Sequence, residues 1–191
     1  MLGRLVRRWR SVRRSGRRLA LLGRDAKGSA AVEFALVVPF LIYAYFGGVE
    51  LVQGISISRQ VALTATTVGN VVTQYTTISA SSQMPDILNS AVQIMSPNPI
   101  ANATVVVSCI SISNTGVATV SWSQSLNGTP RPTGQVVAVP ALLDVPNTTV
   151  VLSEATYAYT PTFDFINMGA KTMYSSVYMV PRDATTINLA A

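Results

Sequence analysis

The chain holds few of the residues that commonly do chemistry in enzymes. It has no histidine and one cysteine, Cys109, so it lacks the ligands of a zinc cluster and the second thiol of an intrachain disulfide. The sequence contains no phosphate-binding glycine motif and no nucleophile elbow. The later acids are scattered, without the spacing of a paired catalytic site: Asp86, Asp144, Glu154, Asp164 and Asp183. We therefore expect no enzyme, no cofactor and no metal site.

Cys109 lies within the apolar run Ala103–Ile112. A thiol in such a run behaves as a small hydrophobic side chain, and we predict that it is buried. A redox role, or a disulfide to another chain, is the alternative.

Positive charge is concentrated at the N-terminus. Residues 1–27 contain ten of the fourteen Lys and Arg and one acid, Asp25, whereas residues 28–191 carry four basic and seven acidic residues. A basic arm can bind nucleic acid, but this one adjoins an apolar segment, and Lys and Arg beside a membrane span keep that flank in the cytoplasm. We therefore expect residues 1–28 to form a basic cytoplasmic leader, and we expect no nucleic-acid partner.

The apolar segment Ala30–Val49 has the length of a membrane span. Sixteen uncharged residues separate Glu33 from Glu50, and as a helix they extend about 24 Å, close to the thickness of a hydrocarbon core. We predict a transmembrane helix over residues 29–52, with a kink at Pro39, because membrane helices tolerate proline. The alternative is a buried helix of a globular core.

Glu33 is the costly residue of this span. A carboxylate near the start of a membrane helix must reach the headgroups, stay protonated or find a cation. Two interpretations therefore stay open, in which Glu33 either snorkels towards the cytoplasmic headgroups or pairs with a specific partner.

The stretch after the span also has helical spacing. Its apolar residues fall three, four or seven positions apart: Leu51, Ile55, Ala62, Ala65, Val68 and Val72. We predict that residues 53–75 extend the membrane helix and lay this stripe on a domain or a neighbouring subunit. The Thr/Ser-rich stretch Tyr75–Gln83 is predicted to be a linker.

Residues 76–191 are predicted to form a small domain. A helix is expected over Asp86–Met95, opened by Pro85. The expected strands are Ala103–Ile112, Val117–Ser125, a half-exposed Thr148–Thr160, and Thr172–Val180. Ser113–Gly116 is typical of a hairpin turn, and Gly128–Asp144 of a loop. The predicted fold class is α+β, a long N-terminal membrane helix extended outside the membrane and then a mainly antiparallel sheet of about four strands with one or two helices.

Aromatic residues are frequent in the C-terminal third. They are Tyr157, Tyr159, Phe163, Phe165, Tyr174 and Tyr178. We expect them to pack in the core and on the sheet faces, with a partner-binding surface as the alternative.

One local pattern is more specific. In Gly28-Ser-Ala-Ala-Val-Glu33-Phe34, glutamate stands five residues after a glycine, directly behind the basic leader and at the start of the span. This resembles the cleavage site of type IV prepilins, where a membrane-embedded peptidase cuts after the glycine. The resemblance implies that Ser29 becomes the new N-terminus, and that Glu33 and Phe34 serve peptidase recognition and subunit register.

The wider stretch from Gly28 to Leu63 resembles the TadE-like pseudopilins of tight-adherence (Flp-type) pilus systems. The likeness includes the run Ala31–Leu36, Pro39, the Gly47–Glu50 exit and the pair Arg59-Gln60. The tail of the chain, with Ala158–Phe165 and Val180–Arg182, resembles the family loosely.

The resemblance implies a minor pilin-like subunit or assembly factor of the bacterial inner membrane, with residues 76–191 as a periplasmic α+β domain. Its expected partners are the lipid bilayer, the prepilin peptidase, and other pilins or pseudopilins with their assembly machinery. Cleavage would give Glu33 a partner, because an α-amino group on Ser29 and a carboxylate offset each other's desolvation cost. The alternative is an uncleaved single-pass envelope protein whose periplasmic domain binds a ligand or partner protein.

Overall fold

The computed structural model describes residues 26–165 and 167–191. The chain divides into two compact units, with the boundary between Gly48 and Val49. Helix α2 (Ala26–Val72) contributes to both, because its 47 residues run without interruption across this boundary. The predicted leader, residues 1–28, lies almost entirely outside the described residues.

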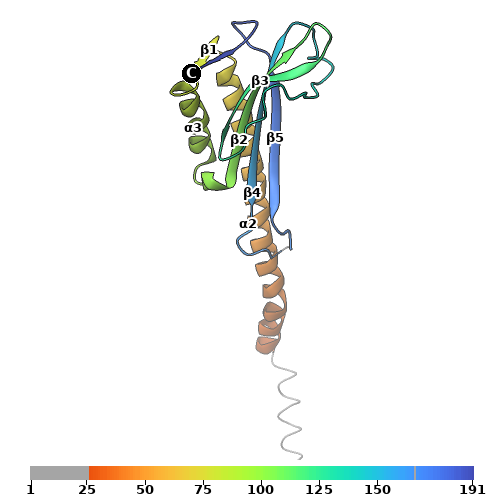
Figure 1. Cartoon of the computed structure of the whole chain (residues 1–191). Coiled ribbons are helices and arrows are strands. Elements are labelled where there is room, and N and C mark those ends of the chain that lie inside the picture. The colour runs from red at the N-terminus through yellow and green to blue at the C-terminus, as the bar shows by residue number, and fades with distance from the viewer. Residues whose placement is uncertain (1–25, 166) are drawn as a thin grey trace, which may run out of the picture. The chain divides into compact units, whose positions relative to one another are not determined.

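The unit from Val49 onwards is an α+β domain (Figure 1). Its four-stranded sheet has the order β3-β2-β4-β5, and all neighbouring strands are antiparallel. The strands are β2 (Ala103–Ile112), β3 (Ala118–Leu126), β4 (Thr149–Tyr159) and β5 (Lys171–Met179). The predicted fold class is confirmed, and each predicted strand is present with ends that differ by at most one residue.

The turn between β2 and β3 is the predicted one. The N–H of Gly116 donates to the carbonyl of Ser113 at 3.1 Å, and Gly116 has a φ of 79°. A left-handed backbone of this kind favours glycine, which explains why the chain reverses at this position.

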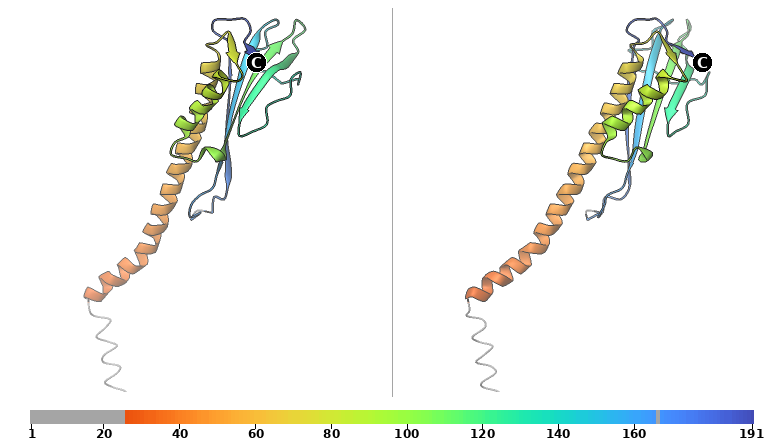
Figure 2. Two further views of the ribbon diagram at one scale, coloured as in Figure 1. Left: turned by 60° about the vertical axis from the view of Figure 1, so that its left-hand side comes forward. Right: turned by 90° about the vertical axis from the view of Figure 1, so that its left-hand side faces the viewer.

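Two helices cover one face of the sheet (Figure 2). They are the C-terminal part of α2 and α3 (Gln83–Met95). Their buried apolar side chains form one core with the sheet: Ile57, Val61, Ala65, Val68 and Val72 from α2, and Met84, Ile87, Leu88, Ala91 and Met95 from α3. The predicted short helix is confirmed and begins two residues before Pro85, because proline is tolerated in a first helical turn.

Helix α2 packs closely against the sheet at Gly69. A Cβ placed at Gly69 would lie 3.0 Å from the Cβ of Ser153 and 3.4 Å from the Sδ of Met179. Gly69 therefore leaves the space that this packing needs.

The opposite face of the sheet is covered by the loop Gly128–Asp144. Val137, Val139 and Leu143 pack against a second buried cluster that includes Ile110 and Leu152. Strand β4 is consequently buried on both faces from Thr149 to Ser153, so the prediction of a half-exposed strand is wrong for this half, where the loop shields the second face from water. From Glu154 to Tyr159, buried residues alternate with partly or fully exposed ones, as predicted.

Two predictions about local segments are also corrected. The predicted linker Tyr75–Gln83 contains strand β1 (Thr77–Ser79), which pairs in parallel with β6 (Asn188–Ala190) near the end of the chain. In the predicted stripe of α2, Leu51 and Ile55 are 48% and 55% exposed, and Ala62 is exposed too. Helical spacing identifies apolar positions but does not say which of them face the sheet.

Candidate functional site

The segment that resembles a prepilin cleavage site is helical in the structure. Gly28 and Ser29 lie in the first turn of α2, and a Cβ placed at Gly28 would have no neighbour within 4 Å. The hydroxyl of Ser29 donates to Oε1 of Glu33 at 3.1 Å. This contact joins positions four residues apart, which share one face of a helix. Glu33 is exposed, and Phe34 is 69% exposed.

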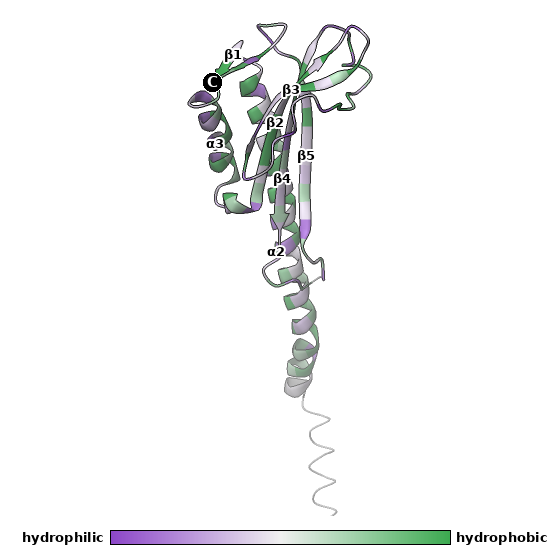
Figure 3. Cartoon of the chain, viewed as in Figure 1, coloured by the Kyte–Doolittle hydropathy of each residue, from purple (hydrophilic) through white to green (hydrophobic). Residues whose placement is uncertain are grey.

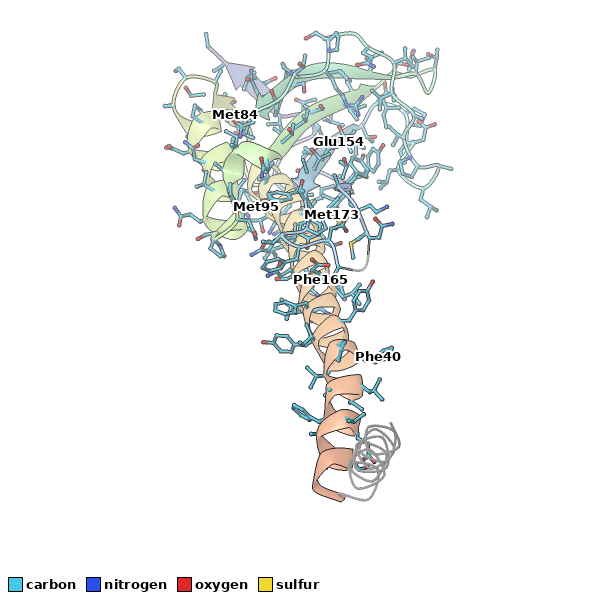
Figure 4. All side chains as sticks on the ribbon, turned by 90° about the horizontal axis from the view of Figure 1, so that it is seen from below. Phe40, Met84, Met95, Glu154, Phe165 and Met173 are labelled. Carbon is cyan, nitrogen blue, oxygen red and sulfur yellow. The ribbon has the colours of Figure 1, made fainter. Side chains whose placement is uncertain are left out.

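Exposed apolar side chains follow on all sides of α2. Seven large ones between positions 36 and 45 are at least 47% exposed: Leu36, Val37, Phe40, Leu41, Ile42, Tyr43 and Tyr45. Figure 3 shows that hydrophobic colour dominates this stretch, and Figure 4 shows the ring of Phe40 standing out from the helix. A helix that is apolar all round belongs either in a core or in a membrane, and these residues pack in no core of the described structure.

Among the described residues, α2 is the one helix that is long and apolar enough to cross a membrane, by length and composition. It continues through Pro39. An internal proline removes one backbone hydrogen bond of a helix and is rare in soluble helices. Membrane-spanning helices commonly contain a proline, because neighbouring groups satisfy the freed carbonyl. The predicted kink at Pro39 stays a prediction.

Glu50 marks the end of the apolar stretch, and its side chain enters the folded unit. It is 1% exposed, and Oε1 accepts the N–H groups of Phe163 and Phe165 at 3.1 and 3.4 Å. The hydroxyl of Tyr159 donates to the backbone carbonyl of Glu50 at 3.4 Å. Burial is the larger cause, and the charge of Glu50 the smaller one, of a raised pKa of Tyr159. The phenol therefore keeps the proton that it donates to the carbonyl of Glu50. The carboxylate thus ties the chain after β4 to the start of the folded unit.

In the sequence, Glu50 stands out as the end of the uncharged stretch and as part of the family resemblance, but its contact with Phe163 and Phe165 is not predicted. A signal was available, because an acid directly after sixteen uncharged residues must find donors if the domain buries it. Nothing in the local sequence indicates that the donors lie more than 110 positions away.

The C-terminal aromatic residues divide between core and surface. Tyr157 and Tyr159 are 3% and 4% exposed and pack against the helices, as expected for core residues. Phe163 and Tyr174, by contrast, are 61% and 59% exposed. The prediction of core packing therefore holds for Tyr157 and Tyr159. Phe163 and Tyr174 lie on the surface of the domain instead.

Glu154, one of the scattered acids, is held in structural contacts. The guanidinium of Arg131 binds the carboxylate of Glu154 at 2.8 Å, and the hydroxyl of Tyr174 donates to the same carboxylate at 2.9 Å.

Within residues 26–165 and 167–191, no group of three or more His, Cys, Asp or Glu could hold a metal ion. Cys109 is 1% exposed, as predicted, and burial raises its pKa to about 11. A protonated, enclosed thiol is a poor nucleophile.

A groove of the domain passes beside α2. It is lined by uncharged residues, among them Gln53, Gln60, Asn98 and Tyr159, and encloses about 520 Å³. Two of its amides bind each other, because Asn98 Nδ2 donates to Gln60 Oε1 at 2.6 Å. The groove can offer hydrogen bonds to a polar ligand, but it holds no acid or base for proton transfer.

Comparisons with known proteins give no family assignment. No protein-family model, no curated protein and no solved structure matches this chain. The resemblance to TadE-like pseudopilins therefore rests on the sequence motifs from Gly28 to Leu63.

Proposed function

We propose that this chain is a pilin-like (pseudopilin) subunit of a tight-adherence type IV pilus system. In this proposal, the membrane span is shortened from the predicted residues 29–52 to residues 29–48, because Glu50 is buried in the folded unit. The span crosses the bacterial inner membrane, the leader lies in the cytoplasm, and the domain lies in the periplasm. The observation that supports this proposal most directly is that the two parts of α2 have different surroundings. One uninterrupted helix exposes apolar side chains on every side before Gly48 and packs in the core of a domain after it.

Such a helix suits a subunit that passes between a membrane and an assembly. Its apolar part is stable in lipid and equally stable against the apolar helices of neighbouring subunits, since both surroundings satisfy the same side chains. The domain packs on the part of the helix after Val49, so lateral contacts between the apolar parts would bring the domains of neighbouring subunits together. The proposed action is mechanical assembly rather than catalysis.

The start of the helix supports processing after Gly28. Cleavage there would place an α-amino group on Ser29, and the contact from Ser29 to Glu33 shows that both positions share one helix face. An amine and a carboxylate on such a face can pair within one chain or between neighbouring chains, which lowers the cost of placing either in hydrocarbon. We assign Glu33 this register role, and Phe34 with it to peptidase recognition.

The decisive experiment is N-terminal sequencing of the mature protein from cells with and without the prepilin peptidase. We expect Ser29 as the first residue when the peptidase is present and Met1 when it is absent. A matched variant, Gly28→Ala, should remain unprocessed, and the open space around Gly28 means that the substitution leaves the helix intact. Intact Met1 in the presence of the peptidase would contradict the processing.

Glu33→Gln tests the register role separately from the anchor. We expect loss of pilus assembly with normal membrane insertion, because the amide keeps the size of the side chain and removes its charge. Unchanged assembly would remove the pairing role and leave the membrane assignment intact.

A second candidate is an uncleaved single-pass envelope protein whose domain binds a ligand or partner protein. The polar groove beside Gln60 and Asn98 is the observation that favours it. This candidate assigns no role to Gly28, so a Gly28→Ala variant with the same N-terminus and function as the native chain would support it over the pseudopilin.

A further inference from the structure

Phe163 is a large aromatic side chain held on the surface at a defined place. It is 61% exposed, and its ring lies 5.8 Å from the ring of Phe165 at an interplanar angle of 45°. The backbone N–H groups of both residues donate to the buried carboxylate of Glu50. A buried acceptor that binds two N–H groups restricts the backbone around Phe163, so the fold fixes the place at which this ring is attached.

The position of this segment relative to the apolar stretch follows from the covalent chain. Glu50 is two residues beyond Gly48 in a continuous helix, and two residues of helix rise about 3 Å. Whatever the orientation of the domain, Glu50 must therefore lie at the point where the apolar stretch ends. Residues hydrogen-bonded to its side chain lie there as well.

The composition of the segment suits an interface between water and lipid. Thr160–Phe165 contains one charged residue, Asp164, whose Oδ1 accepts the N–H of Gly169 at 2.9 Å. The carboxylate is thus engaged by its own loop. Pro161 is buried, while Thr162 and Phe163 are exposed. An exposed apolar ring such as that of Phe163 is stabilised when it moves from water into the boundary between headgroups and acyl chains.

We propose that Thr160–Phe165 is a second membrane contact, in which Phe163 enters the outer boundary between headgroups and acyl chains while Glu50 positions the segment. This rests on the proposed membrane span of α2. The contact fixes the domain against the bilayer at two places, the helix and this segment, and so restricts its tilt. The occupant is the lipid surface itself, not a protein.

The test uses nitroxide labels on the full chain in vesicles of phosphatidylethanolamine and phosphatidylglycerol. Cys109→Ala removes the native thiol, and single cysteines replace Phe163, Leu142 or Phe40. Leu142 is the matched control, because it is 94% exposed and precedes Leu143, which packs on the far end of the sheet. Strand β4 separates that end from Tyr159 by about 33 Å. The readout is the accessibility of each label to lipid-soluble oxygen relative to a water-soluble nickel chelate.

We expect the ratio of oxygen to nickel accessibility to be several-fold higher at position 163 than at position 142, and highest at position 40. Equal ratios at 163 and 142, with a lipid-like ratio at 40, would overturn the second contact and leave the membrane span intact. A water-like ratio at 40 would instead contradict the span, and the second contact would fail with it. If Phe163→Cys does not fold, a label on the exposed neighbour Thr162 gives the same comparison.

Discussion

The two parts of helix α2 contain similar apolar residues in opposite surroundings. Before Gly48, Phe40 and Tyr45 are 76% and 68% exposed, whereas after Val49 the side chains of Val61 and Val68 are 1% and 0% exposed. The difference lies in what surrounds the helix, because the second part packs on a sheet and the first part meets no described residue of a core. The helix therefore continues whether or not protein side chains cover it. In the proposed function, lipid surrounds the part before Gly48.

The largest expected effect comes from a charge in the packed part. Val68→Asp should unfold the domain, because an unpaired carboxylate at a fully buried position costs about 4 kcal/mol or more, a large share of a typical domain's stability. Thermal unfolding of the Val49–Ala191 unit within the full chain is the measurement. A cooperative transition at the native temperature would show that this part of α2 does not belong to the core.

The matched substitution in the exposed part is Leu41→Asp. Its position is 59% exposed, so the free energy of unfolding of the domain should change by less than about 0.5 kcal/mol. Membrane insertion should weaken by about 3 kcal/mol, the cost of aspartate near the centre of a span. Resistance to alkaline extraction from membranes reports the insertion, and extraction equal to that of the native chain would argue against the span.

The packed part of α2 also belongs to the core that encloses Cys109. Burial raises the pKa of this thiol from 9.0 to about 11, so the folded state retains its proton where the unfolded state loses it. The resulting stabilisation is complete below pH 9 and is lost as the pH rises through 11, a total of about 3 kcal/mol. The difference in unfolding free energy between the native chain and Cys109→Ala should change by about 2 kcal/mol between pH 8 and 11. A difference independent of pH would mean that water reaches the thiol.

A smaller effect is expected at the junction of the two parts. Glu50→Ala removes the acceptor of two backbone N–H groups and should destabilise the domain by about 2 kcal/mol. Glu50→Gln should cost less, since its amide oxygen still accepts. Urea unfolding measures both, with the exposed Glu33→Gln as the control that leaves the domain unchanged. Equal stability of Glu50→Ala and the native chain would show that the tie to Phe163 is weak.

The smallest effect compares two glycines of α2. Gly69→Ala should destabilise the domain by about 1 kcal/mol, because a Cβ only 3.0 Å from that of Ser153 forces overpacking that exceeds the gain in helix propensity. Gly54→Ala should stabilise it by up to about 1 kcal/mol, since the nearest atom to its Cβ would be at 3.8 Å. Chemical denaturation measures the change in the free energy of unfolding for each variant. If both substitutions stabilise the domain, strand β4 must move enough to accommodate a Cβ at Gly69.

The strands were predictable because their signals are local. The β-branched run Ala103–Ile112 and the turn at Gly116 define β2 and its hairpin within a few residues of sequence. Strands β1 and β6 were missed, since each has three residues and pairs with a partner more than 100 positions away. A local sequence pattern does not predict a pairing between two short strands that are so far apart in the chain.

The candidate site divides in the same way. The stretch from Gly28 to Pro39 was recognisable because a basic leader, a glycine, an acid and an apolar run follow one another in sequence. The role of Glu50 was not, because its donors come from Phe163 and Phe165 after four strands have assembled. Likewise, spacing alone marked Leu51 and Ile55 as packed, whereas the sheet lies against Ile57 and Val61.

The most direct test of the two-part helix compares two leucines of nearly equal exposure. Leu41 is 59% and Leu63 is 55% exposed, so the protein itself shields them equally. In a Cys109→Ala background, each is replaced by cysteine and treated with a membrane-impermeant maleimide in open membrane fragments. We expect Leu63→Cys to react and Leu41→Cys to react only after denaturation in detergent. Reaction of Leu41→Cys at the rate of Leu63→Cys in intact bilayers would contradict the membrane span.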